Sequence, residues 1–264
     1  MNPRFTPTTV RLLLIAALVA VAATLPASAG IAGAGATGIQ LLNLGTTTTD
    51  VEVQFRPQGG GAATSVHRSG VASGSAVNLY LPMESGLSNG AFSAAILGAP
   101  EVAALSRTDW GSSGGAVLVE GAADDNAVSI PLALSNDAFD TLVNVQNTDT
   151  AAPAAVSIAA VRNGTTAVAA TVDLTIAAGA SATVDLGRHP AFAALGNFDG
   201  ALLVTADRAV AASAIVDGET SPMGVAGYAA PSVDAAAGRL LLPYVPLEAV
   251  DAAGATWHST LALH

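Results

Sequence analysis

The residues whose type and spacing come closest to catalytic chemistry are the serines at 111–115, a segment that reads Gly-Ser-Ser-Gly-Gly. It fits the Gly-x-Ser-x-Gly pattern of hydrolase nucleophiles, in which Ser113 would attack a carbonyl carbon. Such a serine needs a histidine base within hydrogen-bond reach and an acid that orients the histidine. His67 is the only histidine between residues 38 and 135, and Ser and Gly residues surround it. We therefore interpret 111–115 as a flexible loop and predict that the protein is not an enzyme.

The densest group of candidate metal ligands is Asp124-Asp125-Asn126. Ca²⁺ requires six or more oxygen ligands, and three consecutive residues cannot all point at one ion. Asp124 and Asp125 are the candidate calcium ligands, with Asp137 or Asp140 as further donors. The favoured interpretation is a solvated turn between two strands. The four histidines share no metal-ligand spacing, so no cofactor is expected.

Two kinds of residue are candidates for binding rather than catalysis. Trp110 falls in a predicted loop, where an indole can stack on a sugar ring, which makes it the candidate glycan contact. Asn43 and Asn147 occupy matching positions in two similar stretches of sequence. For this pair we favour a structural role, because Asn side chains cap turns.

The N-terminal residues have the three-part pattern of a secretory signal. Arg4 and Arg11 flank a polar start, residues 12–25 are almost wholly apolar, and Ala27-Ser28-Ala29 follows Pro26. An apolar run of about 14 residues is shorter than the roughly 20 that span a bilayer. We expect a signal helix cleaved after Ala29 and an extracellular or cell-surface location; an uncleaved anchor is the alternative.

The charge of the mature chain restricts its partners. Asp and Glu number 20 and Lys and Arg number 9, all of them Arg, so loss of Arg4 and Arg11 leaves 7 − 20 = −13. Such a surface disfavours nucleic acid and anionic lipid. There is no other long apolar run and no cysteine, so we expect neither a membrane span after signal cleavage nor disulfides.

The chain contains an internal repeat, because residues 38–134 and 140–247 share five anchors in the same order. The offsets between anchors rise steadily from 104 to 112, as loop insertions would produce. The anchor pairs are Asn43 and Asn147, Gly74 and Gly179, Phe92 and Phe198, Val102 and Val210, and Pro131 and Pro243.

The elements within each repeat are predicted to be strands. Val51, Val53 and Phe55 alternate with polar residues, a period of two that buries one face of a sheet. Asn163-Gly164 predicts a hairpin turn. Six or seven short strands in about 105 residues are typical of an antiparallel sandwich.

These patterns predict an all-β protein of two tandem immunoglobulin-like antiparallel β-sandwiches, preceded by the signal helix. The predicted segments are a signal peptide at 1–29, a linker at 30–37, repeat 1 at 38–135, repeat 2 at 136–254, and the first strand of a third, incomplete repeat at 255–264.

The order of these motifs resembles the tandem immunoglobulin-like repeats of large bacterial cell-surface and envelope proteins. The resemblance covers nearly all of residues 38–264 and implies secretion, repetition and a scaffold or adhesive role, with no catalytic residues. The first repeat departs from the pattern at Ala94, where glycine is expected, and no sorting motif indicates how the protein would be attached to a surface.

We therefore expect a non-catalytic secreted or cell-surface structural or adhesive module; the alternative is a carbohydrate-binding accessory domain of a secreted protein. The expected partners are other envelope or matrix proteins, with glycans under the alternative. Residues 256–263 are expected either to dock on the second repeat or to mediate self-association, because an unpaired apolar strand recruits partners and no lysine protects it.

Overall fold

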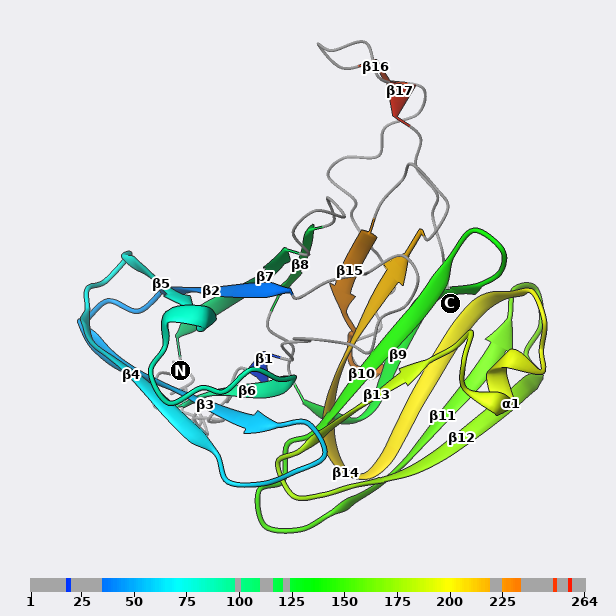
Figure 1. Ribbon diagram of the computed structural model, residues 1–264, viewed down its shortest axis with the longest axis horizontal. Coiled ribbons are helices and arrows are strands. Elements are labelled where there is room, and N and C mark those ends of the chain that lie inside the picture. The colour runs from blue at the N-terminus through cyan, green and yellow to red at the C-terminus, as the bar shows by residue number, and fades with distance from the viewer. Residues whose placement is uncertain are drawn as a thin grey trace, which may run out of the picture.

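A computed structural model describes residues 18–19, 35–97, 101–109, 116–120, 124–218, 225–233, 249–250 and 256–257. Figure 1 shows a protein built of strands, and every strand pair is antiparallel in the described residues, which confirms the predicted all-β class. The helices there are a single 3₁₀ turn, η1 (Leu81–Met83), and the four-residue α1 (Pro190–Ala193). Neither is long or apolar enough to cross a membrane.

The strands from β2 to β8, which we call the N-terminal unit, form two sheets of four strands together with the two-residue strand β1. One sheet has the order β1-β6-β3-β4 and the other β5-β2-β7-β8. The strands of the first sheet are β1 (Leu18–Val19), β6 (Phe92–Leu97), β3 (Thr49–Pro57) and β4 (Thr64–Val71). Those of the second are β5 (Ala76–Tyr80), β2 (Ala36–Asn43), β7 (Val102–Asp109) and β8 (Ala116–Glu120).

The core of the N-terminal unit lies between these two sheets. Val53 and Phe55 of β3 are fully buried and share one apolar cluster with Ile39 and Leu41 of β2. The alternating pattern of β3 therefore buries the face that the sequence predicts.

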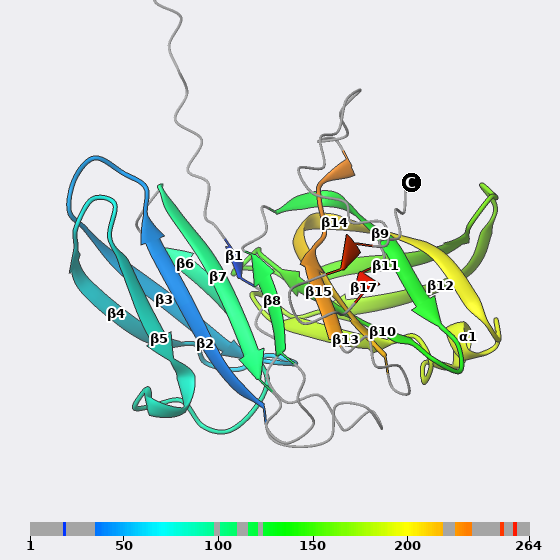
Figure 2. The ribbon, with the colours of Figure 1, turned by 90° about the horizontal axis from the view of Figure 1, so that it is seen from above.

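The strands from β9 to β15, which we call the C-terminal unit, form one curled sheet of seven strands. Its strands are β9 (Asp125–Ser135), β10 (Asp140–Asn147), β11 (Ala154–Arg162), β12 (Val168–Ile176), β13 (Ser181–Asp185), β14 (Phe198–Asp217) and β15 (Val225–Ala229). Figure 2 shows the two units side by side.

The long strand β14 gives the C-terminal unit its curl. Its first part pairs with β11 and β9, whereas its last part pairs with β10 and β15. The register shifts between Thr205 and Val210, around the exposed Asp207 and Arg208. The sequence predicts that the second repeat is a sandwich of two separate sheets. In the structure the C-terminal unit has one sheet, because β14 continues through the bend instead of ending there.

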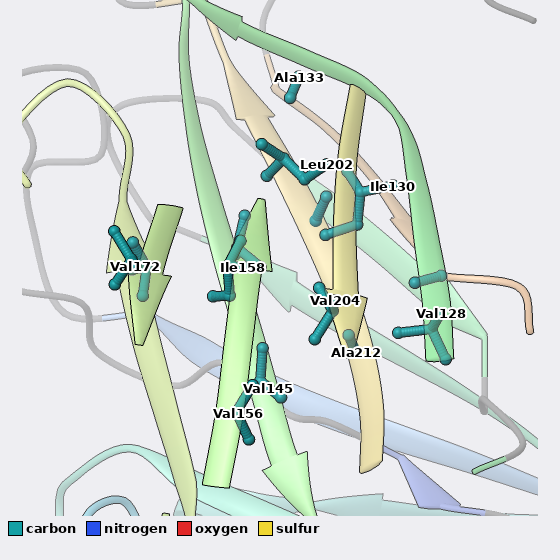
Figure 3. Packing of buried hydrophobic residues seen from close by; sticks show 14 of the residues in the cluster. Val128, Ile130, Ala133, Val145, Val156, Ile158, Val172, Leu202, Val204 and Ala212 are labelled. Carbon is teal, nitrogen blue, oxygen red and sulfur yellow. The ribbon is translucent and has the colours of Figure 1, made fainter. Parts of the chain in front are cut away.

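The core of the C-terminal unit fills the inside of this curl. Side chains from β9, β11 and β14 point into a common interior in Figure 3, where Ile130, Ile158 and Leu202 are fully buried. Strand β9 belongs to this sheet, since it pairs along β14 and contributes Val128 and Ala133 to the same core. The boundary predicted at 135 places these residues at the end of repeat 1.

Three other expectations bear on local structure. The Asn163-Gly164 hairpin is confirmed, with β11 paired to β12 and a positive φ at Gly164. Of the expected signal helix, only Leu18 and Val19 are described; they are extended and pair with β6, whose edge offers backbone partners. Of 255–264, only Thr256–Trp257 is described, as the strand β17 paired with β16 (Ala249–Val250).

Candidate functional site

The recurring asparagines hold matching turns in the two units. Asn43 Nδ2 donates to Thr47 O at 2.8 Å and to Val71 O at 2.9 Å, while its Oδ1 accepts from Gly45 N at 2.9 Å. The side chain thus joins the end of β2 to the following loop and to the end of β4.

Asn147 repeats this arrangement at the end of β10. Its Nδ2 donates to Ala152 O at 2.8 Å and to Ile176 O and Ala177 O at 3.2 Å, and its Oδ1 accepts from Asp149 N at 3.0 Å. Both asparagines are buried. These bonds account for the recurrence and support the structural interpretation of the pair.

Polar contacts also join the two units in the described residues. Gln58 Nε2 of the N-terminal unit donates to Thr183 Oγ1 at 2.6 Å, and Thr183 Oγ1 lies 2.6 Å from Asn144 Oδ1. One chain of hydrogen bonds therefore runs from the end of β3 across β13 to the buried face of β10.

Backbone and small side-chain contacts extend this interface. Gly59 N donates to Ser181 O at 3.0 Å, and Ser93 Oγ lies 3.3 Å from Gly179 O. Ala95 of β6 packs against the fully buried Ala211 of β14. Backbone hydrogen bonds and small apolar side chains fix a relative orientation more firmly than exposed ion pairs do.

Sequence reasoning missed this interface. Thr183 and Asn144 lie in segments that the repeat comparison aligns, but Gln58 does not, and the contact joins non-matching positions of the two units. An interface between repeats leaves no periodic signal in a single sequence, so only the three-dimensional arrangement reveals it.

A second cluster that the sequence did not indicate is a pair of carboxyl groups near α1. Asp140 is buried at the start of β10, and its Oδ1 accepts from Thr141 N at 2.8 Å and Gly187 N at 2.9 Å. Burial, together with a hydrogen bond to the neighbouring Asp185 and repulsion from its charge, raises the pKa of Asp140 to about 7. The pair holds a proton that an exposed aspartate would release.

The calcium candidates each have a protein partner at the N-terminal end of β9. Asp124 Oδ2 accepts from Thr148 Oγ1 at 2.8 Å, and Asp125 accepts a hydrogen bond from Ser232 Oγ, which holds the pKa of Asp125 below its usual value. Asp137 and Asp140 follow the other end of this 11-residue strand. An extended strand rises about 3.3 Å per residue, so the four carboxylates do not converge. The described residues contain no group of three or more potential ligands.

Of the remaining candidate residues from the sequence, the structure describes His67 but not Trp110 or Ser113. Trp110 and the Gly/Ser segment 111–115 lie outside the described residues, so their assignments stay predictions. His67 is exposed on β4, where it pairs across the strands with Glu52. The structure therefore gives no geometry between His67 and Ser113.

A polar hollow of about 510 Å³ lies at one end of the C-terminal unit. Its lining includes Asn136, Asn163 and Asp199. Arg162 closes one side: its guanidinium donates to Asn197 O and Leu195 O, both at 2.7 Å, and lies 5.6 Å from the Phe198 ring centroid. The hollow presents amide and carboxylate groups, and it has no exposed aromatic face because Phe198 is buried.

Comparison with known proteins found no family model, no curated protein and no solved structure that matches this chain.

Proposed function

We propose that this chain is an exported, non-catalytic structural or adhesive module, in which two related antiparallel β-units, a two-sheet sandwich followed by a single curled sheet, form a spacer of fixed geometry. The observation that carries the proposal is the hydrogen-bonded interface from Gln58 through Thr183 to Asn144. Independent domains joined by a flexible linker would not need such a contact.

The tandem-repeat part of the proposal rests on the correspondence between the units. The strand pairs β2–β7 and β10–β14 share the same pairing at one end. The asparagine that ends the first strand lies opposite a valine of the second: Asn43 opposite Val102, and Asn147 opposite Val210. Strand β5 pairs with β2 on its other side, as β13 pairs with β10. Unrelated β-structures would not share both the asparagine turn and the order of its neighbours.

The export part of the proposal rests on the leader sequence, and the signal peptidase site tests it directly. The full chain, expressed in a bacterial host with a general secretory pathway, should be recovered outside the cytoplasm with Gly30 as its first residue. Ala29→Arg should block cleavage, because signal peptidase requires a small residue at that position. Recovery of a cytoplasmic protein that begins at Met1 would refute export.

The spacer role predicts that the two units tumble as one particle. Small-angle scattering of residues 30–264 should fit one rigid shape, and Gln58→Ala together with Thr183→Ala should increase the radius of gyration and the apparent flexibility. The exposed Asn78→Ala change is the matched control. Scattering that already requires independent units in the unaltered protein would contradict the proposal.

The polar hollow favours a second candidate function, carbohydrate binding. Sugars are held by planar amides and carboxylates, which Asn136, Asn163 and Asp199 supply. A glycan array with residues 30–264, repeated with Asn163→Ala and with Trp110→Ala, tests both candidate contacts. An array without hits would remove this alternative and leave the spacer proposal standing.

A further inference from the structure

The edge of β6 has far fewer partners than its opposite side. On one side β6 pairs with β3 along its whole length, from Phe92 to Leu97. On the other side, the described residues supply partners only for Ala94 and Ala95, which pair with Val19 and Leu18 of β1.

The corresponding edge in the C-terminal unit is filled. Strand β14 pairs with β11, the counterpart of β3, and on its other side β9 runs alongside it from Phe198 to Thr205. Strand β1 thus occupies, over two residues, the position that β9 occupies in the second unit.

The composition of β6 is that of a covered strand. Its residues, Phe-Ser-Ala-Ala-Ile-Leu, include no charged residue and no proline. The outer strand β4 of the same sheet carries His67 and Arg68, which discourage pairing. An apolar edge without such protection recruits another strand.

The strand that covers β6 here belongs to the predicted signal. Under the proposed export, cleavage after Ala29 removes Leu18 and Val19, and the outward N–H and C=O groups of β6 lose their partners. This step rests on the proposed function.

A second segment of the chain has the sequence of the strand that fills the other edge. Leu242-Pro243-Tyr244 matches Ile130-Pro131-Leu132 of β9 at an offset of 112. At that offset the three buried apolar residues of β9, Val128, Ile130 and Ala133, correspond to Leu240, Leu242 and Val245, all of which are apolar.

The shared proline fits the same role. In β9 the register with β14 shifts between the pairs formed by Ile130 and Ala133, and Pro131 lies in this irregular stretch. A proline is tolerated where the ladder is interrupted. Pro243 falls at the matching position. The second proline of residues 240–247, Pro246, corresponds to Leu134, whose N–H donates to Thr141 Oγ1, so neither proline removes a hydrogen bond that β9 makes to β14.

We propose that residues 240–247 of one copy pair with the β6 edge of a second copy, so that the mature protein assembles head to tail by strand addition. The chain order supports a second copy as the source. Strand β9 follows the N-terminal unit yet completes the next unit along the chain, and residues 240–247 follow the C-terminal unit in the same way. Strand addition supplies main-chain hydrogen bonds, and the inward apolar side chains supply register.

A disulfide trap tests this pairing, since the protein has no cysteine of its own. Ala94 corresponds to Gly200, which lies opposite Ala133, and Ala133 corresponds to Val245. Mixing mature Ala94→Cys and Val245→Cys copies that carry different tags should give a mixed disulfide dimer, because paired strands bring Cα atoms within about 6 Å. His67→Cys on the opposite edge replaces Ala94→Cys in the control and should give no dimer above background.

Association of the cysteine-free mature protein provides a second readout that does not alter the core of the N-terminal unit. Sedimentation should show concentration-dependent multimers. Val245→Asp, at an inward position, should weaken association by at least about tenfold, whereas Leu241→Asp, which corresponds to the less buried Ser129, should preserve it.

The outcomes separate this inference from the proposed function. A protein that begins at Gly30 but stays monomeric, or a double variant that forms the disulfide only within one copy, overturns the strand exchange and leaves export intact. A protein that retains Met1 overturns export itself.

Discussion

Asn43 and Asn147 make the same three kinds of hydrogen bond at the ends of β2 and β10. Each side-chain amide donates to the loop after its strand and to the chain that leaves β4 or β12, and each carbonyl accepts from the backbone two residues on. One buried side chain thus joins three segments in each unit, which makes the asparagine a point where β-strands are held in register.

Asn147→Ala should therefore lower the free energy of unfolding by about 2–4 kcal/mol, because it leaves several buried backbone groups without partners. Urea unfolding of residues 30–264 measures the effect. The exposed Asn78→Ala should change stability by less than about 0.5 kcal/mol. Equal effects of the two changes would show that the bonds at Asn147 contribute nothing.

Part of the fold follows from the sequence because local patterns encode it. The alternation at Val51, Val53 and Phe55 predicts which face of β3 is buried, and Asn163-Gly164 predicts the hairpin. The bend in β14 has no such signal: no turn motif marks Asp207 and Arg208, and the backbone stays extended through them.

The candidate sites were less predictable because they depend on contacts distant in sequence. The sequence indicates Asp140 only as a further calcium donor, and its partner Asp185 is 45 positions away. Gln58 and Thr183 are separated by 125 positions and occupy different places in the two repeats. Neither pair can be found from composition or period.

The Asp140–Asp185 pair should make stability depend on pH near neutrality. The folded protein keeps Asp140 protonated up to a pKa of about 7, whereas the unfolded chain releases the proton near about 4. The folded state therefore binds more protons between these values, and the free energy of unfolding falls as pH rises through this window. Thermal unfolding at constant ionic strength should give a higher Tm at pH 5 than at pH 8.

Asp140→Asn isolates this group, because the amide keeps the Oδ1 acceptor for Thr141 N and Gly187 N without the charge. The variant should have a flatter pH profile between 5 and 8 and a raised Tm at pH 8. The buried Asp217, opposite Asp140 on β14, also faces this region and stays unchanged in the comparison. An identical profile for the variant and the original protein would rule out the pair as the source.

The hydroxyl of Tyr228 should stabilise the contact between β15 and β9. It donates to Leu132 O at 2.5 Å and lies 3.2 Å from Leu132 N, and burial raises the pKa of Tyr228 to about 12. Tyr228→Phe should cost about 1–2 kcal/mol, because it leaves both backbone groups of Leu132 without this partner. Tyr80→Phe, on a side chain that is 47% exposed, should be nearly neutral in the same denaturation measurement.

Gly200 should be the glycine least tolerant of a side chain in the C-terminal unit. A Cβ at this position would lie 2.1 Å from Val161 O and 2.9 Å from Phe198 Cζ, and a backbone atom cannot move aside as a flexible side chain can. Gly200→Ala should therefore lower the free energy of unfolding by about 3 kcal/mol or more, through forced separation of β14 from β11.

Gly164→Ala measures the cost of backbone strain alone, without the steric clash expected at Gly200. Gly164 has a φ of +73°, and a Cβ added there would have no atom within 4 Å, so its replacement should cost only the left-handed penalty of about 1–2 kcal/mol. The N-terminal unit carries Ala94, which is fully buried, at the position that matches Gly200, so a methyl group fits at that position of the first unit. Ala94→Gly should therefore leave a small cavity and destabilise the protein by about 1 kcal/mol. Equal costs for Gly200→Ala and Gly164→Ala would show that β14 can shift away from Val161 without loss.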